Sequence, residues 1–400
     1  MSPVTEAPAA VKLTDRINRI EPSATMAAVA EAEKLRQQGI EVVDCTAGEP
    51  HFPTPEHIKE AAIAAIRANF SRYTAVGGTL DLKDAIIKRH STDFGSTYKR
   101  EEVCASVGGK HALFNVISAL VDHGDEVILP VPYWVSFKDI VNYAGGTCVL
   151  LHADEEQSFR VTAQMVERLI TPRTKLIILN SPSNPSGAVM SPADMMEVVR
   201  LGYERGIWVI SDECYVYLNY TERNFSAGSL NEYRDRFLVV GSLSKTYAMT
   251  GWRLGYTLGP SAVVSAVQKL QSQSTSNPTS IVQKAAVAAL NGSQQCVAEM
   301  RGEYIRLRDH IVVGLCAIPG IRCTMPEGAF YAYPNVSALF GKGGLRSAAD
   351  VAHGLLHKAH VATVAGEGFG TTEHVRISYA TSMENLNKAL QRIRKYVQTL

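Results

Sequence analysis

The sequence has no excess of charge of either sign. Among its 400 residues, 40 Lys and Arg stand against 39 Asp and Glu, which gives a formal net charge of +1. Proteins that bind nucleic acid through its phosphates usually carry a strongly basic surface, so nucleic acid is not an expected partner. Hydrophobic residues make up 46% and charged residues 20% of the chain, which is typical of a globular protein.

The sequence also lacks the patterns of secreted and membrane proteins. Its seven cysteines include no CxxC pair, and an odd number of scattered cysteines favours a reducing compartment and gives no basis for a zinc site. The opening MSPVTEAPAAVKLTDR has no apolar core of a signal peptide. No stretch approaches the roughly 20 apolar residues of a transmembrane helix. We therefore expect a cytoplasmic protein with no membrane contact.

Short apolar segments alternate with helical patterns through the middle of the chain. Residues 175–179 (KLIIL) are apolar on both faces, which is typical of a parallel strand covered by helices on both sides. Segments such as 111–121, 192–205 and 261–270 have apolar residues at helical spacing. This alternation predicts an α/β fold whose large domain holds a mostly parallel seven-stranded sheet flanked by helices. The expected strands are 103–107, 126–129, 148–151, 175–179, 208–211, 237–241 and 255–258.

The pattern changes after about residue 294. A long helical pattern at 296–315 is followed by β-rich segments and by a helix from Met383, which predicts a smaller α+β domain. Residues 14–50 are expected to join it, so that both ends of the chain form the small domain. The expected division is a flexible arm at 1–13, small-domain parts at 14–50 and 294–400, and a large domain at 51–293. The β-rich segments are 322–325, 330–333, 361–364 and 374–378.

A lysine with phosphate-binding neighbours follows one of these strands. The loop at 241–255 (GSLSKTYAMTGWRLG) places Ser242 and Ser244 just before Lys245, and Arg253 eight residues after it. Hydroxyls and a planar guanidinium together suit the oxygens of a phosphate. Taken alone, the loop could equally be a polar surface turn.

Other polar side chains come at the ends of neighbouring strands. Asp212 and Tyr215 follow the apolar run 207–210, and Asn184 lies in a proline-containing loop after 175–179. Ligands of open α/β sheets bind beyond the carboxyl ends of the strands. There a carboxylate can keep a pyridine nitrogen protonated, and Tyr215 and Asn184 can bind a ring oxygen. Asp212 could instead cap the next helix, and the loop of Asn184 could be an ordinary turn.

A glycine pair precedes the predicted helix at 111–121. In the segment Gly108, Gly109 and Lys110, glycine lets the backbone approach a phosphate, and the helix N-terminus favours an anion. The spacing is not that of a Walker loop.

Together these segments resemble the fold-type I, class I/II aminotransferases, which use pyridoxal 5′-phosphate. The likeness is closest to the bacterial aspartate aminotransferase subgroup, including its aspartate/prephenate relatives, and it runs from about Arg19 to Leu400. Independent motifs occur in the family's order. They are AGEP at 47–50, GGKHALF at 108–114, PYWVS at 132–136, NSPSNPSG at 180–187, SDECY at 211–215, SLSKTYAMTGWRLGY at 242–256 and VRISYATS at 375–382.

The resemblance implies a role for each matching residue around the cofactor. Lys245 is the catalytic residue, which holds the cofactor aldehyde as a Schiff base and moves the substrate proton. Asp212 pairs with the pyridine nitrogen, Trp134 stacks on the ring, and Tyr215 and Asn184 bind the ring oxygen. The phosphate is held by Ser242, Ser244, Arg253 and the backbone of Gly109 and Lys110, and by Tyr73 from a partner subunit. The implied assembly is a homodimer with its active sites at the interface.

The resemblance also suggests the substrates, an amino acid and a 2-oxo acid. Arg376 would bind the α-carboxylate, with Gly48, Trp134 and Asn184 beside it. Residues 271–278 contain no arginine for a distal carboxylate, but Lys110 matches the lysine that the subgroup uses there. Ser23 and Thr25 match the neighbouring hydroxyls. This favours L-aspartate and 2-oxoglutarate, which exchange their amino group in two half-reactions to give oxaloacetate and L-glutamate.

Several alternatives stay open. Relatives that aminate prephenate tend to carry a basic residue where this chain has Glu21, so prephenate or another aromatic substrate ranks lower. His51 stands where the subgroup usually has Asp. Another pyridoxal enzyme, such as a C–S lyase or an aminocyclopropane-carboxylate synthase, would share the fold and the lysine. A non-enzymatic regulator is disfavoured, because the resemblance begins too early to leave room for a DNA-binding domain before it.

Overall fold

The computed structural model describes residues 12–22, 24–221 and 225–400. Its seven-stranded sheet has the order β2-β8-β7-β6-β5-β3-β4, and β8 runs antiparallel to both of its neighbours while the other pairs are parallel. All seven strands expected from the sequence are present, so the predicted sheet is confirmed. The strands are β2 (Val103–Ser106), β3 (Glu126–Val131), β4 (Thr147–His152), β5 (Thr174–Asn180), β6 (Trp208–Asp212), β7 (Phe237–Ser242) and β8 (Gly255–Leu258).

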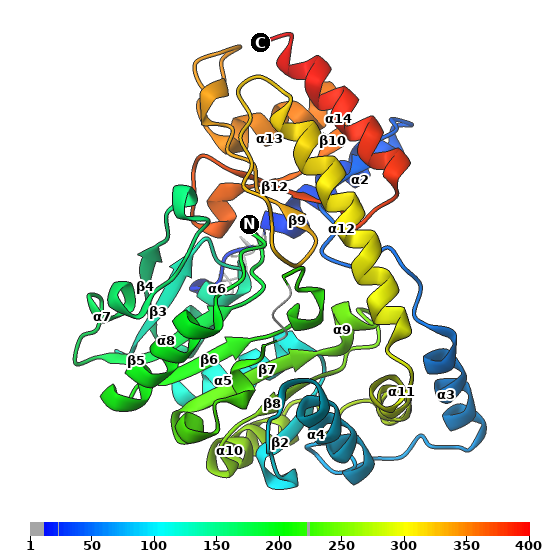
Figure 1. Ribbon diagram of the computed structural model, residues 1–400, viewed down its shortest axis with the longest axis vertical. Coiled ribbons are helices and arrows are strands. Elements are labelled where there is room, and N and C mark those ends of the chain that lie inside the picture. Colours follow the sequence, from blue (N-terminus) through cyan, green and yellow to red (C-terminus); the bar gives the residue numbers. More distant parts are fainter. Residues whose placement is uncertain (1–11, 23, 222–224) are drawn as a thin grey trace, which may run out of the picture.

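Alternating residues of the central strands enter two different apolar cores. In β5, Ile177 and Leu179 pack into the core on one face of the sheet, while Leu176 and Ile178 pack into the core on the other. This two-sided burial explains why the strand is apolar at each of its four buried positions, 176–179. Helices cover both faces (Figure 1). They are α3 (Glu56–Arg67), α4 (Leu80–Phe94), α5 (Gly109–Leu120), α6 (Ser136–Ala144), α7 (Ala163–Glu167), α8 (Pro192–Arg205), α10 (Ser261–Ser272) and α11 (Ser280–Asn291).

The helix boundaries follow local sequence signals. Ser191 caps α8 by accepting a hydrogen bond from the amide of Asp194, Pro192 occupies its first turn, and Gly206 ends it in the left-handed conformation. Ser242 caps the short α9 (Leu243–Thr246) in the same way, accepting from the amide of Ser244. The cap places Lys245 one turn beyond the carboxyl end of β7.

A third apolar core lies above the sheet and draws on distant parts of the chain. Val43 and Cys45 pack there together with residues between 300 and 396, and β1 pairs in parallel with β10, Val43 opposite Val361. We call the elements around this core the small lobe and those around the sheet the large lobe. The small lobe contains α2 (Ala24–Gln37), β1 (Val43–Asp44), β9 (Tyr331–Ala332), α13 (Ala348–Ala359), β10 (Val361–Ala362), β11 (Val364–Ala365), β12 (Val375–Ser378) and α14 (Met383–Val397).

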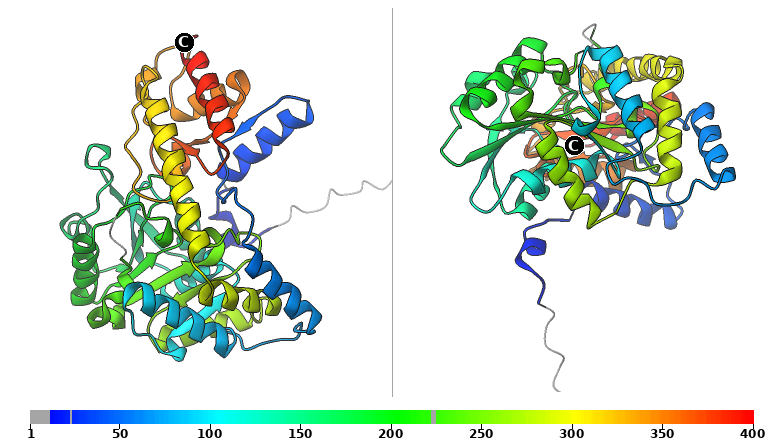
Figure 2. Two further views of the ribbon diagram at one scale, coloured as in Figure 1. Left: turned by 45° about the vertical axis from the view of Figure 1, so that its right-hand side comes forward. Right: turned by 90° about the horizontal axis from the view of Figure 1, so that it is seen from below.

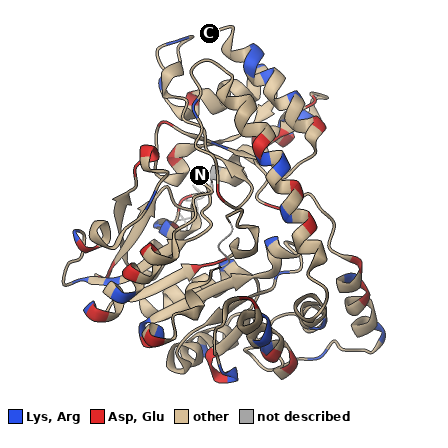
Figure 3. Cartoon of the chain, in the orientation of Figure 1, with Lys and Arg blue, Asp and Glu red and all other residues tan. Residues whose placement is uncertain are grey.

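One long helix, α12 (Gln295–Cys316), extends from the large lobe into the small lobe, as the left-hand view of Figure 2 shows. Ahead of α2, the chain forms the single turn α1 (Asp15–Asn18), which contacts α6. Basic and acidic side chains are interspersed along the helices of both lobes (Figure 3), in keeping with the near-zero net charge. None of the helices in the described part of the chain is both long and apolar enough to cross a bilayer.

Two expectations for the small lobe were wrong. Residues 361–364 form not one strand but two, because β10 pairs with β1 whereas β11 pairs with β12 in another sheet. Residues 322–325 form no strand, and the segment makes one isolated bridge, from Arg322 to Asn335. Most of the expected arm at 1–13 lies outside the described residues.

Candidate active site

The carboxyl ends of β5, β6 and β7 meet the small lobe at Lys245. The Lys245 Nζ donates a hydrogen bond to the carbonyl oxygen of Gly48, which the small lobe supplies. Burial lowers the pKa of this amine, Cys214 and Glu49 act in the opposite direction, and Arg253 and Arg376 lower it further. A lysine with a lowered pKa is a better base near neutral pH.

Asp212 ends β6 and is 4% exposed. Its Oδ1 accepts a hydrogen bond of 3.0 Å from the amide of Cys214. Burial raises the pKa of this carboxyl to about 7, against the effects of that hydrogen bond and of Lys245. As a helix cap, Asp212 would therefore make only this one backbone contact. A buried carboxyl of this kind suits a cationic partner such as a protonated ring nitrogen.

Arg376 on β12 reaches the same place from the small lobe. It is 1% exposed, and it donates from Nη1 to Asn184 Oδ1 at 3.0 Å and from Nη2 to the carbonyl of Thr46 at 2.8 Å. Among the described residues its buried Nε has no hydrogen-bond partner. A guanidinium held at two points with a donor to spare fits an incoming carboxylate.

Tyr331 on β9 is a site residue that sequence reasoning missed. Its hydroxyl lies 2.7 Å from the hydroxyl of Tyr215, and the guanidinium carbon of Arg376 lies 4.6 Å from its ring centroid. Burial raises the pKa of Tyr331 to about 12 and raises that of Tyr215 well above its usual value, so both are neutral hydrogen-bond donors at pH 7. The sequence marked 330–333 as a strand, but nothing in it indicated which tyrosine faces the site.

The predicted phosphate site has close backbone packing. Gly108 has a φ of +88°, and a Cβ there would lie 2.5 Å from the Arg253 Nη2, so this position requires glycine. A Cβ at Gly109 would lie 3.2 Å from the Cβ of Ser242. The N-terminus of α5, Arg253 and Ser242 therefore meet as expected, and Ser244 is buried beside them. The backbone donors, hydroxyls and guanidinium present there fit a phosphate group.

Lys110 and Trp134 lie side by side at the next edge of the site. The Lys110 Nζ is 4.9 Å from the centroid of the Trp134 ring, and partial burial lowers the pKa of Lys110, as Arg253 does, while Asp139 raises it. The amide of Glu21 donates to Asp139 Oδ1 at 3.4 Å. The segment before α2 is thus held next to Asp139, whose carboxylate lies near Lys110.

Within the described part of the chain, two predicted site residues, Tyr73 and Thr25, make no hydrogen bond to the groups around Lys245. Tyr73 is 89% exposed. Thr25 lies in the first turn of α2 and is half-buried, and Ser23 lies outside the described residues. His51, the departure at the end of the AGEP motif, packs against Phe52 and Tyr304 with ring centroids 4.2 and 5.7 Å away. Its ring contributes to the packing between the start of the large lobe and α12.

Comparison with known proteins agrees with this geometry. The family described as aminotransferase class I and II matches residues 40–393. An aspartate aminotransferase from Geobacillus stearothermophilus is 40% identical over 97% of this chain and 99% of its own. An aspartate/prephenate aminotransferase from Nitrosomonas europaea is 43% identical over 96% and 99%. The structure of Thermus thermophilus aspartate aminotransferase with maleate superposes with a TM-score of 0.92 at 40% identity, covering 96% of this chain and all of that one.

Proposed function

The chain belongs to the class I and II aminotransferases, whose cofactor is pyridoxal 5′-phosphate, and we propose that it transfers the amino group of L-aspartate to 2-oxoglutarate. The products are oxaloacetate and L-glutamate. The observation that carries the proposal is Arg376, fully buried against Asn184 and the Thr46 carbonyl with its Nε unpaired among the described residues. Arg376 lies close enough to Lys245 to lower the pKa of its amine, so a substrate carboxylate bound to Arg376 would lie near that amine.

We assign the cofactor to the region between Lys245, Asp212 and the N-terminus of α5. When bound, pyridoxal phosphate would supply an aldehyde that takes the amino group and a ring that accepts the electron pair released at the substrate Cα. Asp212 would keep the ring nitrogen protonated, and Trp134 would stack on the ring. Tyr215 and Asn184 would bind the ring oxygen. The residues that would hold the phosphate are Ser242, Ser244, Arg253, Gly109 and the backbone of Lys110.

Within that pocket Lys245 moves the proton. Burial and the nearby guanidinium groups of Arg253 and Arg376 favour its neutral amine, which can take a proton from the substrate Cα and return it. The carbonyl of Gly48 accepts a hydrogen bond from this amine and fixes its position. Arg376 orients the substrate, because two of its donors are already anchored to the protein.

The preference for a dicarboxylate rests on Lys110. Its ammonium lies beside Trp134, where it can pair with a second carboxylate, and Thr25 and Ser23 add hydroxyls. The relative from Thermus thermophilus was solved with maleate, a four-carbon dicarboxylate. Aspartate has the same number of carbons and two carboxylates.

Prephenate is a second candidate because the relative from Nitrosomonas europaea is named for both activities. Glu21 argues against it in this chain. The amide of Glu21 is bonded to Asp139. Burial raises the pKa of Asp139, and so does the nearby Glu21 carboxylate, while Asp139 in turn raises the pKa of Lys110. A substrate with a further carboxylate would be repelled by these acidic groups.

We further propose a homodimer, since Tyr73 is 89% exposed and would reach the phosphate of a partner subunit. A cytoplasmic location is supported by seven free thiols. For the domains, we propose parts of a small domain at 14–50 and 294–400 and a large domain at 51–293, on the basis that the two ends of the chain share a core.

The test follows the two half-reactions separately through the absorption of the bound cofactor. Aspartate added to the purified holoenzyme should convert the cofactor to its amino form with stoichiometric release of oxaloacetate, and 2-oxoglutarate should restore the starting spectrum. Prephenate and aromatic 2-oxo acids, run in parallel, should restore it more slowly. Release of ammonia or a thiol without conversion of the cofactor would overturn the proposal in favour of a lyase.

A further inference from the structure

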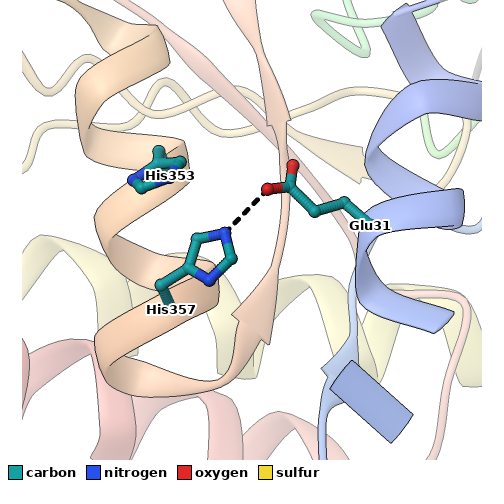
Figure 4. Close-up of side chains that lie close together, drawn as sticks. All are labelled: Glu31, His353 and His357. Carbon is teal, nitrogen blue, oxygen red and sulfur yellow. Dashed lines mark hydrogen bonds and ion pairs between the residues drawn. The ribbon is translucent and has the colours of Figure 1, made fainter. Parts of the chain in front are cut away.

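Two imidazoles and a carboxylate lie together between α2 and α13 (Figure 4). His353 and His357 project one turn apart from α13, with ring centroids 4.3 Å from each other. Glu31 enters from α2, and its Oε1 lies 2.7 Å from the Nε2 of His357. One ligand atom from each of the three residues lies within 4.8 Å of the other two.

These separations are close to those around a metal ion. In a tetrahedral zinc site with bonds of 2.0–2.1 Å, two ligand atoms lie about 3.3 Å apart. The contact between Glu31 and His357 would therefore lengthen by about 0.6 Å, and the longest separation would shorten by about 1.5 Å. His353 is exposed, and Glu31 and His357 are half-buried, so side-chain rotation is sufficient.

We propose that Glu31, His353 and His357 bind a divalent transition-metal ion, with water as the remaining ligand. Imidazole nitrogen suits Zn²⁺, Cu²⁺ and Ni²⁺, whereas Ca²⁺ and Mg²⁺ prefer several oxygen ligands. Two histidines four residues apart on one helix present their rings on the same face. An ion pair between Glu31 and His357 would by itself need no second imidazole in contact with the first.

Such an ion would join two elements that otherwise meet through a small apolar contact. Ala32 and Leu35 of α2 form a separate core cluster with Leu356 of α13 and Ala362 of β10. The ligands flank this contact, since Glu31 precedes Ala32 and His357 follows Leu356. Bound metal would fasten α2 to α13 and stabilise the position of the N-terminal helix on the small lobe.

The test uses the untagged, full-length holoenzyme, freed of metal with a chelator and titrated with ZnCl₂ by calorimetry. Wild type should bind one Zn²⁺ per chain at this site. Loss of a group that only supports a metal ligand costs 10–100-fold in affinity, so removing a ligand itself in His353→Ala or His357→Ala should weaken binding by at least about 100-fold. His152→Ala, which removes an exposed histidine at the end of β4, is the matched control and should bind as wild type does.

Two further readouts separate this site from other metal ligands of the chain. Co²⁺ should give visible d–d bands in wild type and in Glu31→Gln at reduced affinity, but not in His353→Ala. Zn²⁺ should raise the unfolding midpoint of wild type and leave that of His353→Ala unchanged. Retained cofactor absorption shows that each variant is folded. Equal Zn²⁺ affinity in wild type and both histidine variants, or a thiolate charge-transfer band with Co²⁺, would overturn the proposal.

Discussion

The two ends of the active site are built differently. The cradle, by which we mean Lys245, Asp212, Asn184, Tyr215 and Arg376, is almost closed to solvent, with Asp212 at 4% and Arg376 at 1% exposure. Its groups are hydrogen-bonded to one another, to the backbone or to the hydroxyl of Tyr331.

The rim, by which we mean Glu21, Thr25, Tyr73 and Lys110, is open by comparison. Tyr73 is 89% exposed, and Glu21 is held by a long hydrogen bond of 3.4 Å. Buried, mutually bonded groups hold their geometry before a ligand arrives, whereas exposed ones gain order when it binds. We therefore propose that the reaction depends on the residues of the cradle and that the choice of substrate depends on those of the rim.

Lys245→Ala is the strongest test of the cradle. Removal of the amine eliminates both the covalent bond to the cofactor and the proton transfer, so kcat/KM for aspartate should fall by at least about 10⁴-fold. Lys269→Ala, in the exposed part of α10, is the control and should keep full activity. Steady-state assays with both substrates measure the effect, and a rate near that of wild type would refute the central role of Lys245.

Asp212→Asn tests whether burial in the cradle raises the pKa of the Asp212 carboxyl. Burial raises the pKa of Asp212 from 3.8 to about 7, so the folded chain holds this proton more tightly, and the stability it contributes is lost as pH rises between those values. Without cofactor, the variant should therefore gain about 4 kcal/mol relative to wild type between pH 4 and pH 8, since one pKa unit corresponds to about 1.4 kcal/mol. Urea unfolding at several pH values measures this gain.

The holoenzyme should behave in the opposite way. In the proposed site the protonated ring nitrogen of the cofactor would be a cationic partner for Asp212, so Asp212→Asn should weaken cofactor affinity and slow the half-reaction while it stabilises the cofactor-free chain at high pH. If the difference in unfolding free energy between the variant and wild type were the same at pH 4 and pH 8, the carboxyl of Asp212 would not be desolvated. The contrast between cradle and rim would then fail.

Lys110→Ala tests the rim. Loss of one partly exposed ammonium should raise KM for aspartate about tenfold, because a hydrogen bond to a charged group contributes about 1.5–3 kcal/mol. The rate with an aromatic amino acid, which has no distal carboxylate, should change little. Lys138→Ala on the neighbouring α6 is the matched control. An equal loss for both substrates would place Lys110 with the phosphate rather than with the substrate.

Tyr331→Phe should have the smallest effect. The change removes one hydroxyl, which contacts Tyr215 at 2.7 Å, and a neutral hydrogen bond contributes about 0.5–1.5 kcal/mol. We expect kcat to fall by about tenfold or less while KM is unchanged, together with a shifted absorption band of the bound cofactor, whose ring oxygen Tyr215 faces. An unchanged spectrum would mean that Tyr331 only fills space beneath Arg376.

The difference between cradle and rim also explains what could be predicted from the sequence. Lys245, Asp212 and Asn184 follow apolar strands, and parallel strands bring their carboxyl ends together, so their meeting could be expected. The position of Tyr331 at the site could not be expected, because β9 is only two residues long. The direction of its side chains depends on packing against residues distant in the sequence. The split of 361–364 into β10 and β11 was missed for a similar reason, since β10 pairs with β1 near the start of the chain, whereas β11 turns away to pair with the nearby β12.

The pairing of β1 with β10 has a consequence for how the protein is made. Val43 leaves the ribosome long before Val361, its partner. At about 5–20 residues per second, the interval is roughly 15–60 s. During that time the sheet, whose strands lie between residues 103 and 258, can form, while α2 and β1 remain without their docking surface. Nascent chains stalled before residue 361 should therefore expose Ala32, Leu35 and Val43 to proteases and chaperones.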